Sequence, residues 1–318
     1  MNSKPTTEHF CTLFDSHYLP LGIALHQSLM THAKSFHLWV LCIDEEVELS
    51  LQKLDLPYVS LMPLREMETA ELLAVKPNRT RGEYCWTLTP FIFQAVFDQD
   101  PNIEQVTYLD ADLFFFDDPA ILLNEFMADK HVLFTEHAYA PEYDQTATSG
   151  KFCVQFLTVR CTDRALKVIY WWQKKCLQWC FNRIEDGKFG DQKYLESWPT
   201  LFGDDVQIVE NIEKTLAPWN IAYFERTLPE LSPVFYHFHG LKIISEKQAQ
   251  LYFRYRINSK GMDLYCHYIQ ALAIAKTRLE ALNIRWRYFP LPKDKMATLR
   301  RWKWLIFKEV RFRKIETI

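Results

Sequence analysis

The sequence predicts an α/β fold in which helices flank a mostly parallel central sheet. In the first two-fifths of the 318 residues, short apolar runs typical of strands alternate with patterns typical of helices. Hydrophobic residues make up 48% of the chain and charged residues 24%, which is ordinary for a globular protein and excludes wholesale disorder. The chain has 8 glycines and contains neither a dinucleotide-binding fingerprint nor a P-loop motif, so it lacks sequence support for both chemistries.

The elements of the first half are expected to alternate along the chain. Apolar runs that end at turn residues predict strands at 9–14, 36–43, 58–62 and 105–109. Helical spacing of apolar residues predicts helices at 18–30, 46–54, 84–97 with a break near Pro90, and 120–127. Ligands bind at the carboxyl ends of strands in open sheets of this kind. The residues at the ends of the strands are therefore candidates for chemistry: Phe14, Asp15, Asp44, Asp110 and Asp112.

The second half is expected to end in a helical extension. Strands are predicted at 152–159 and 233–238, with a helix capped by Asp163 between them. Further helical patterns follow at 191–197, 245–257, 262–282 and 296–314. We therefore expect a core at 1–245, a helical C-terminal part at 246–292 and a basic amphipathic tail at 293–318.

The charge of the chain is distributed unevenly. The formal net charge is −3, yet the tail at 293–318 carries nine Lys and Arg against three Asp and Glu. Such a tail either docks on an anionic membrane surface or packs on the acidic body, and the sequence leaves both open. The eight cysteines form no C-x-x-C pair, and the N-terminus has no apolar leader. We expect a cytoplasmic protein, peripheral to the inner face of the membrane if the tail docks there, and no nucleic-acid partner.

The sharpest chemical signal is Asp110-Ala111-Asp112, which follows a buried strand and precedes an apolar run. Alternate residues of an extended segment point the same way, so the two carboxylates can converge on one point. They repel each other unless a cation lies between them, and a hard divalent ion accepts ligands from carboxylates and phosphates. The motif predicts Mn²⁺ or Mg²⁺ bound beside a diphosphate. Haloacid dehalogenase phosphatases also carry a D-x-D motif, but theirs follows the first strand.

A second signal lies late in the chain, where His237-Phe238-His239-Gly240 is followed by Lys242. A neutral imidazole can complete a metal site begun by two carboxylates. Gly240 would let a backbone N–H approach a phosphate, and Lys242 supplies a positive charge. Two histidines near a strand end are more often structural when they occur alone.

In the order and spacing of these motifs, residues 9–245 resemble a GT-A-type glycosyltransferase. The pattern is similar to family 8, which holds glycogenin and bacterial lipooligosaccharide galactosyltransferases. The resemblance implies an enzyme that transfers a hexose from a nucleotide-diphosphate sugar, with a UDP-sugar favoured, and retains the anomeric configuration. It also implies a glycan or lipid-linked acceptor in bacterial surface glycan or lipopolysaccharide synthesis.

The resemblance also implies roles for individual residues. The base would lie on the strand edge Thr12, Leu13 and Phe14, with Tyr18 stacked on it. Asp110, Asp112 and His237 would hold the metal and, with Ala111, border the donor. Gly240 and Lys242 would meet the diphosphate. Asp191 and Gln192 would lie near the donor sugar as catalytic residues, although Asp191 could instead, or in addition, cap a helix.

The sequence departs from the family pattern in three places. Lys242 follows His237 by five residues where the family has six. Cys153-Val154-Gln155 replaces the family's Asn-x-Gly strand, and Arg79 and Arg81 are the nearest matches to its basic residue before the metal motif. Two other functions stay open at this point: a sugar-nucleotide nucleotidyltransferase and a catalytically inactive binding protein.

Overall fold

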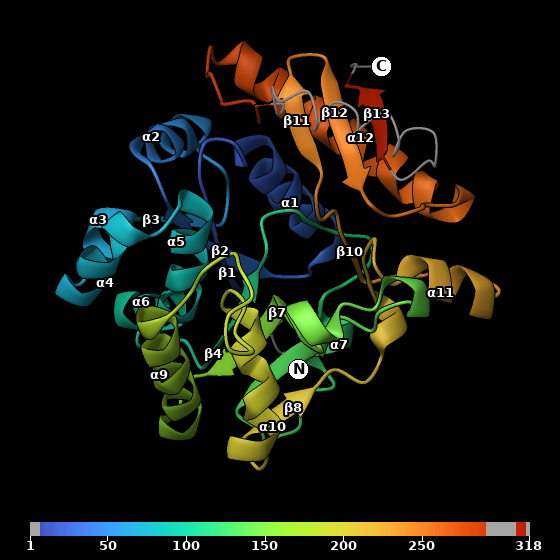
Figure 1. Cartoon of the computed structure of the whole chain (residues 1–318). Coiled ribbons are helices and arrows are strands. Elements are labelled where there is room, and N and C mark those ends of the chain that lie inside the picture. The colour runs from blue at the N-terminus through green and yellow to red at the C-terminus, as the bar shows by residue number, and fades with distance from the viewer. Residues whose placement is uncertain (1–6, 291–309, 316–318) are drawn as a thin grey trace, which may run out of the picture.

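A seven-stranded central sheet organises the N-terminal and middle parts of the chain (Figure 1). The computed structural model describes residues 7–290 and 310–315. The strands, in sheet order, are β3 (Val59–Pro63), β2 (Phe36–Cys42), β1 (Glu8–Phe14), β4 (Gln105–Leu109), β7 (Phe152–Arg160), β6 (Val132–Glu136) and β8 (Val206–Ile208). Neighbours are parallel except that β7 runs antiparallel to both β4 and β6. The prediction of a mostly parallel sheet is therefore confirmed.

Twelve α-helices of the described residues accompany the strands. They are α1 (Leu19–His32), α2 (Glu45–Leu54), α3 (Leu64–Met67), α4 (Ala70–Val75), α5 (Arg81–Leu88), α6 (Ile92–Gln99), α7 (Ala120–Leu123), α8 (Thr146–Ser149), α9 (Asp163–Gln178), α10 (Trp198–Leu201), α11 (Ile221–Thr227) and α12 (Ser259–Ala281). The helix expected at 84–97 is broken as predicted, because Pro90 lies in a 3₁₀ turn between α5 and α6. Thr162, and not Asp163, caps α9, since its hydroxyl accepts from the Ala165 N–H.

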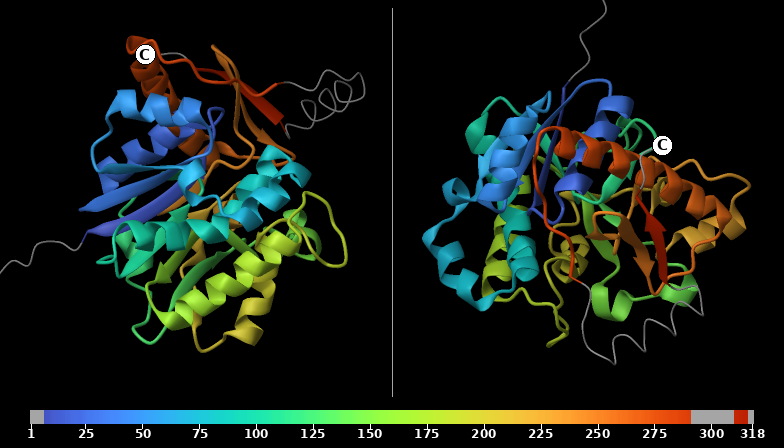
Figure 2. Two further views of the ribbon diagram at one scale, coloured as in Figure 1. Left: turned by 90° about the vertical axis from the view of Figure 1, so that its left-hand side faces the viewer. Right: turned by 90° about the horizontal axis from the view of Figure 1, so that it is seen from above.

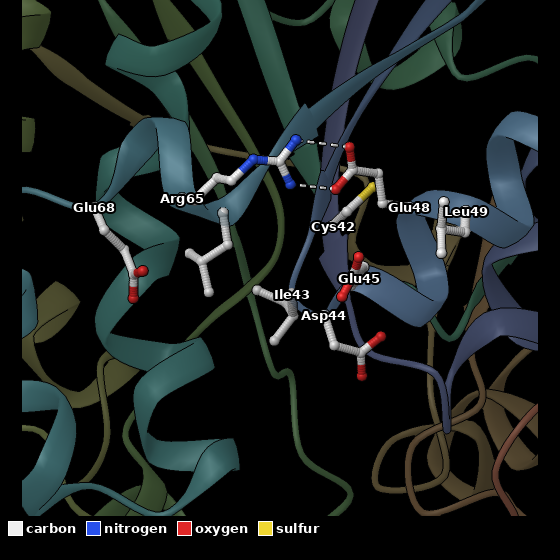
Figure 3. A pocket seen from close by; sticks show the side chains of 9 residues that line it. Cys42, Ile43, Asp44, Glu45, Glu48, Leu49, Arg65 and Glu68 are labelled. Atoms are coloured by element: carbon white, nitrogen blue, oxygen red, sulfur yellow. Dashed lines mark hydrogen bonds and ion pairs between the residues drawn. The ribbon is translucent and has the colours of Figure 1, made fainter.

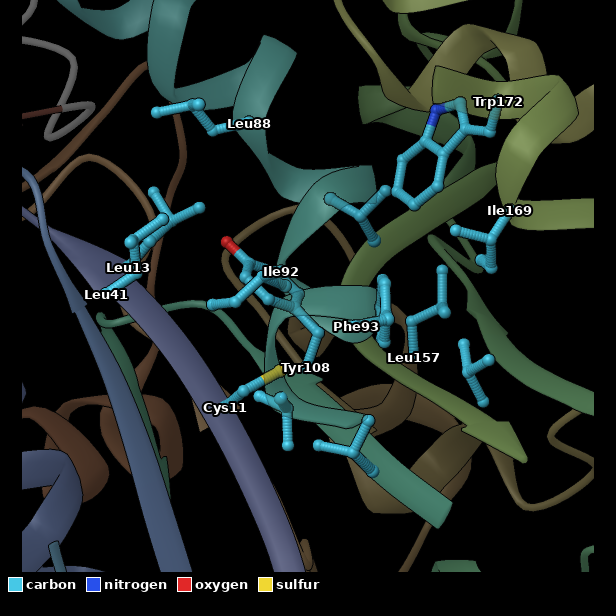
Figure 4. Close-up of a cluster of buried hydrophobic side chains, with 14 of the residues drawn as sticks. Cys11, Leu13, Leu41, Leu88, Ile92, Phe93, Tyr108, Leu157, Ile169 and Trp172 are labelled. Carbon is cyan, nitrogen blue, oxygen red and sulfur yellow. The ribbon is translucent and has the colours of Figure 1, made fainter. Parts of the chain in front are cut away.

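Alternation along the strands separates two apolar layers. Cys11 and Leu13 of β1 face a layer that includes α5, α6 and α9, part of which is drawn in Figure 4. Phe10 and Phe14 face the opposite layer, which includes α1 and α2. Both faces of the sheet are therefore covered, which accounts for the nearly continuous apolar runs of its parallel strands.

A small second sheet extends from the carboxyl end of β4. It contains β5 (Leu113–Phe115), β10 (Phe235–His237) and β9 (Thr215–Leu216). β10 runs antiparallel to β5, with His237 opposite Leu113. This pairing carries the late histidine to the segment that follows the two aspartates.

The C-terminal part corrects the sequence prediction. The expected helix at 245–257 does not form: β11 (Lys242–Ser245) and β12 (Gln248–Phe253) make a hairpin, and β13 (Val310–Lys314) pairs with β12. The prediction that residues 246–292 are helical is therefore correct for α12 and wrong for β12. A helix over 296–314 is also wrong for the strand at 310–314, while residues 296–309 lie outside the described part of the chain.

The reason for this error is long-range pairing. Ala249 and Leu251 of β12 are buried against α12, and β12 obtains its edge partner from a strand some sixty residues later. The two views in Figure 2 show α12 alongside this three-stranded sheet. Across residues 7–290 and 310–315, none of the helices has the length and apolar character needed to cross a membrane.

Candidate metal and donor site

Two chain reversals bring Asp110, Asp112 and His237 together. A tight turn joins β4 to β5, in which the Leu113 N–H donates to the Asp110 carbonyl at 3.1 Å. His237 Nε2 lies 3.1 Å from Asp112 Oδ1 and 3.7 Å from Asp110 Oδ2. One possible ligand atom from each of the three residues lies within 4.8 Å of the others. The structure thus assembles the three residues that the sequence predicts as metal ligands.

Each of the three side chains shifts the pKa of the others. Burial raises the pKa of the Asp110 carboxyl, against the effect of nearby His237. Burial would also raise the pKa of Asp112, but His237 lowers it below its usual value. Burial would lower the pKa of His237, whereas the Asp112 carboxylate raises it.

The donor set fits a divalent cation. Two carboxylate oxygens and one imidazole nitrogen converge from separate segments, and the two negative charges would be neutralised by Mn²⁺ or Mg²⁺. Neighbouring groups already hold the ligands in place: the Tyr108 hydroxyl donates to Asp110 Oδ1 at 3.0 Å. Gln155 Oε1 lies 2.7 Å from His237 Nδ1. Sequence reasoning missed Gln155 as a site residue, because its position on β7 departs from the family pattern.

Asp191 is the third acidic group near this cluster. It is 3% exposed, and burial followed by the charge of Asp110 raises its pKa to about 7. Its side chain makes no capping hydrogen bond to the 3₁₀ helix Gln192–Ser197, and its Oδ2 has no hydrogen-bond partner. The backbone N–H groups of Asp191 and Gln192 and the Thr89 hydroxyl act against this rise in the pKa of Asp191. The side chain of Gln192 is held by Ser149, because its Nε2 donates to the Ser149 carbonyl at 3.0 Å.

The predicted nucleotide edge is mostly core. The side chains of Thr12, Leu13 and Phe14 are all buried, and Phe14 lies against Gly22 so closely that a Cβ there would be 2.4 Å from its ring. The Phe14 carbonyl accepts from the Ile43 N–H at 3.1 Å. These three side chains could contact a nucleotide only if the residues that bury them moved away. Tyr18 lies at the margin, edge-on to Phe289 with ring centroids 5.2 Å apart.

A charged cluster follows the carboxyl ends of β1 and β2. Arg81 Nη1 lies 3.0 Å from both Asp15 Oδ2 and Asp44 Oδ2. Asp44 also accepts from the backbone and hydroxyl of Ser16. The position after each strand predicted that these acids lie at one edge of the sheet, and the structure confirms this. The guanidinium of Arg81 forms an ion pair with both Asp15 and Asp44.

A pocket of about 520 Å³ has Asp44 in its lining. Figure 3 shows the side chains that line it. Its walls carry four carboxylates and one guanidinium, and Arg65 makes two hydrogen bonds to Glu48. The lining residues are Cys42, Ile43, Asp44, Glu45, Glu48, Leu49, Leu64, Arg65 and Glu68. None of the residues predicted to bind metal or donor lines this pocket.

Gly240 and Lys242 lie three and five residues after His237 in the sequence. Gly240 has a φ of +80°, a conformation that favours glycine, and its carbonyl accepts from Gln250 Nε2 at 3.3 Å. Lys242 begins β11 and is exposed, with its Nζ 5.7 Å from the centre of the Phe289 ring. Phe289 thus contacts both Tyr18 and Lys242, and no sequence signal pointed to it.

Comparison with known proteins places the chain in a family. It is 34% identical to the uncharacterized protein YfnD of Bacillus subtilis (strain 168) over 270 residues, which cover 80% of this chain and 85% of YfnD. The chain belongs to the YfnD family. YfnF of the same organism is 32% identical over 256 residues, or 75% of this chain and 83% of YfnF. No protein-family model matches the chain.

Solved structures similar to this YfnD-family chain are glycosyltransferases. The bifunctional glycosyltransferase WbbM has a TM-score of 0.54 at 14% identity, covering 90% of this chain and 53% of WbbM. GlyE of Streptococcus pneumoniae TIGR4 has a TM-score of 0.52 at 13% identity, covering 90% and 67%. The galactosyltransferase LgtC, solved with donor and acceptor sugar analogs, has a TM-score of 0.51 at 12% identity, covering 90% and 98%. These likenesses show the fold, which is of the predicted GT-A type.

Proposed function

We propose that this YfnD-family protein is a metal-dependent glycosyltransferase that moves a sugar from a nucleotide-diphosphate sugar to an acceptor hydroxyl. The convergence of Asp110, Asp112 and His237 carries the proposal, because a buried and a half-buried carboxylate together with an imidazole suit a divalent ion beside a diphosphate. The GT-A-type fold supports it. When bound, Mn²⁺ or Mg²⁺ would neutralise the charge that develops on the leaving diphosphate.

The chain's own residues then take separate tasks. Asp110, Asp112 and His237 hold the ion, and the exposed cation of Lys242, with the Gly240 loop, offers charge and backbone to the diphosphate. Asp191 is buried and carries a carboxyl oxygen with no partner, so it can face a developing positive charge at the donor sugar. A transfer with retention fits this arrangement, with the leaving phosphate taking the acceptor proton.

The partners belong to the same proposal. We infer a UDP-sugar as donor and a glycan or lipid-linked hydroxyl as acceptor, consistent with bacterial surface glycan or lipopolysaccharide synthesis. Tyr18 and the segment after β1 would receive the nucleotide. Peripheral binding of a cytoplasmic protein to an anionic membrane would rest on the basic residues within 293–309, since β13 is paired into the fold.

Donor hydrolysis with a panel of sugar nucleotides tests this function. We expect turnover in Mn²⁺ or Mg²⁺ that EDTA abolishes. Asp112→Asn should lower turnover at least about a hundredfold with little change in Tm, because a carboxylate of the cation site is lost. Asp117→Asn is the matched control, since this exposed acid lies five residues further on. Full activity in EDTA, or equal losses in both variants, would contradict metal-dependent transfer.

A further inference from the structure

The strand β7 is distorted where it passes the cluster of Asp110, Asp112 and His237. Phe134 of β6 pairs with Leu157, but the next residue, Thr135, pairs with Cys153. The three residues between them on β7 therefore bulge away from the β6 ladder, and Gln155 is the middle one. Bulges of this kind redirect side chains and occur often beside active sites. Gln155 is fully buried and reaches His237 from this bulge.

Hydrogen-bond donors and acceptors fix the orientation of the Gln155 amide. The Thr135 hydroxyl lies 3.2 Å from the Cys153 carbonyl, which can only accept, so the hydroxyl proton is used there. The Thr135 oxygen must then accept from Gln155 Nε2, at 3.4 Å. With its nitrogen turned to Thr135, Gln155 presents Oε1 to His237 Nδ1 at 2.7 Å.

This chain of bonds assigns the protons of the imidazole. Gln155 Oε1 is an acceptor, so His237 Nδ1 carries a hydrogen and donates it. The other nitrogen, Nε2, is the one that faces Asp110 and Asp112. A neutral His237 held in this way presents its lone pair to the cluster. The same residue also holds Asp110, whose backbone N–H donates to the Gln155 carbonyl at 3.1 Å.

We propose that Gln155 is a positioning residue for the metal site, which fixes the tautomer and ring orientation of His237 and is itself oriented by Thr135. The proposal rests on the metal dependence proposed above. Groups that hold a metal-binding histidine through its second nitrogen contribute to affinity, and losing one costs about 10- to 100-fold in metal binding. Gln155 would act through His237 and would not touch the ion.

Mn²⁺ binding to the full chain without any donor, measured by electron paramagnetic resonance, tests the proposal. Gln155→Met keeps the length of the side chain and removes the acceptor, and we expect the Kd to rise about 10- to 100-fold. Gln155→Glu keeps an acceptor oxygen and should bind Mn²⁺ at least as tightly as the wild type. Thr135→Val frees the amide to turn and should weaken binding by a smaller factor.

Thr158→Val is the matched control. Thr158 lies on the same strand and is fully buried, and its hydroxyl pairs with that of Thr107 at 2.8 Å. The Thr158→Val variant should leave the Kd for Mn²⁺ unchanged. An unchanged Kd in Gln155→Met, equal weakening in the Met and Glu variants, or no Mn²⁺ binding by the wild type would overturn the proposal. If Mn²⁺ binding depends on Gln155 but no sugar nucleotide is turned over, the transferase function fails while the positioning role stands.

Discussion

At the residue scale, the two late histidines differ although they are two positions apart. His237 is 4% exposed and its Nε2 lies within the acidic cluster. His239 is exposed, and its ring lies against Trp219 with centroids 5.5 Å apart. Only His237 therefore has the geometry of a ligand in this structure, while His239 borders the site.

We predict that His237→Ala weakens Mn²⁺ binding more than His239→Ala does. Removing His237 deletes a ligand, whereas removing His239 changes a surface beside the site. Isothermal titration with Mn²⁺ would measure both constants, and the two single variants serve as controls for each other. A larger loss in His239→Ala would mean that the loop after β10 (Phe235–His237) rearranges when the ion binds.

Asp191 should make stability depend on pH. Its folded pKa of about 7 lies above the ordinary aspartate value of 3.8, so the folded state holds the proton more tightly. Its contribution to stability is therefore greatest below 3.8 and falls as pH rises through 7. Relative to Asp191→Asn, the wild type should lose up to about 1.4 kcal/mol per pH unit over that interval. Denaturant unfolding at several pH values measures this difference, and parallel curves for the two proteins would refute it.

At the element scale, the start of α1 and the segment before residue 290 form one wall of the region that we propose binds the donor. Tyr18 precedes α1, and Phe289 packs edge-on against it while lying near Lys242. The Phe289 backbone N–H donates to the Ile243 carbonyl at 2.8 Å, which ties this wall to β11. The proposed donor region is thus bounded by elements from both ends of the chain.

We predict that Tyr18→Ala raises the KM for the donor. Loss of a base-stacking ring costs about 1–3 kcal/mol, which corresponds to roughly a 5- to 150-fold increase. Tyr18→Phe keeps the ring and should retain most of the affinity. Steady-state kinetics with the preferred sugar nucleotide would show this split. A donor KM that is unchanged in Tyr18→Ala would assign the ring to packing against Phe289 alone.

The C-terminal strand is also part of the folded body. Ile315 follows β13, is 3% exposed and belongs to the apolar cluster beneath α12. Ile315→Ala should lower the free energy of unfolding by about 2–4 kcal/mol, because it removes buried methyl groups and leaves a cavity. Ile274→Ala is the control, since Ile274 is 45% exposed on α12 and should cost far less. Urea denaturation compares them, and equal costs would show that β13 contributes little to stability.

At the scale of the whole molecule, the cluster of Asp110, Asp112 and His237 lies where three sheets meet. Asp110 follows the central strand β4, and His237 ends β10 of the small sheet. The chain enters the C-terminal sheet five residues later, at Lys242. Helix α12 packs on α1, which joins this C-terminal part to the central sheet.

The membrane proposal concerns residues 293–309, which carry six Lys and Arg against two acids. We predict that the full chain sediments with phosphatidylglycerol vesicles at low salt, because each basic residue near an anionic surface is worth about 1 kcal/mol. Neutralising Arg300, Arg301, Lys303 and Lys308 to Gln should reduce this binding while leaving β13 in place. Phosphatidylcholine vesicles are the control. Equal sedimentation of both proteins, or none, would end the membrane proposal.

The sequence by itself determined the alternating core and the first half of the candidate metal site. The strand ending at Leu109 and the two aspartates after it could be predicted, because apolar runs and the residues that end them are local patterns. The helix broken at Pro90 was predictable for the same reason: proline lacks the N–H that a helix needs.

Tertiary structure decided what depends on partners distant in the chain. The pairing of β10 with β5 brings His237 to the aspartates, and the bulge in β7 aims Gln155 at His237. The strand β12 was mistaken for a helix because its edge partner, β13, comes some sixty residues later. Strand pairing draws its hydrogen bonds from another segment, so local periodicity does not specify it. That is why the fold class could be predicted from the sequence, and why the groups that position His237 could not.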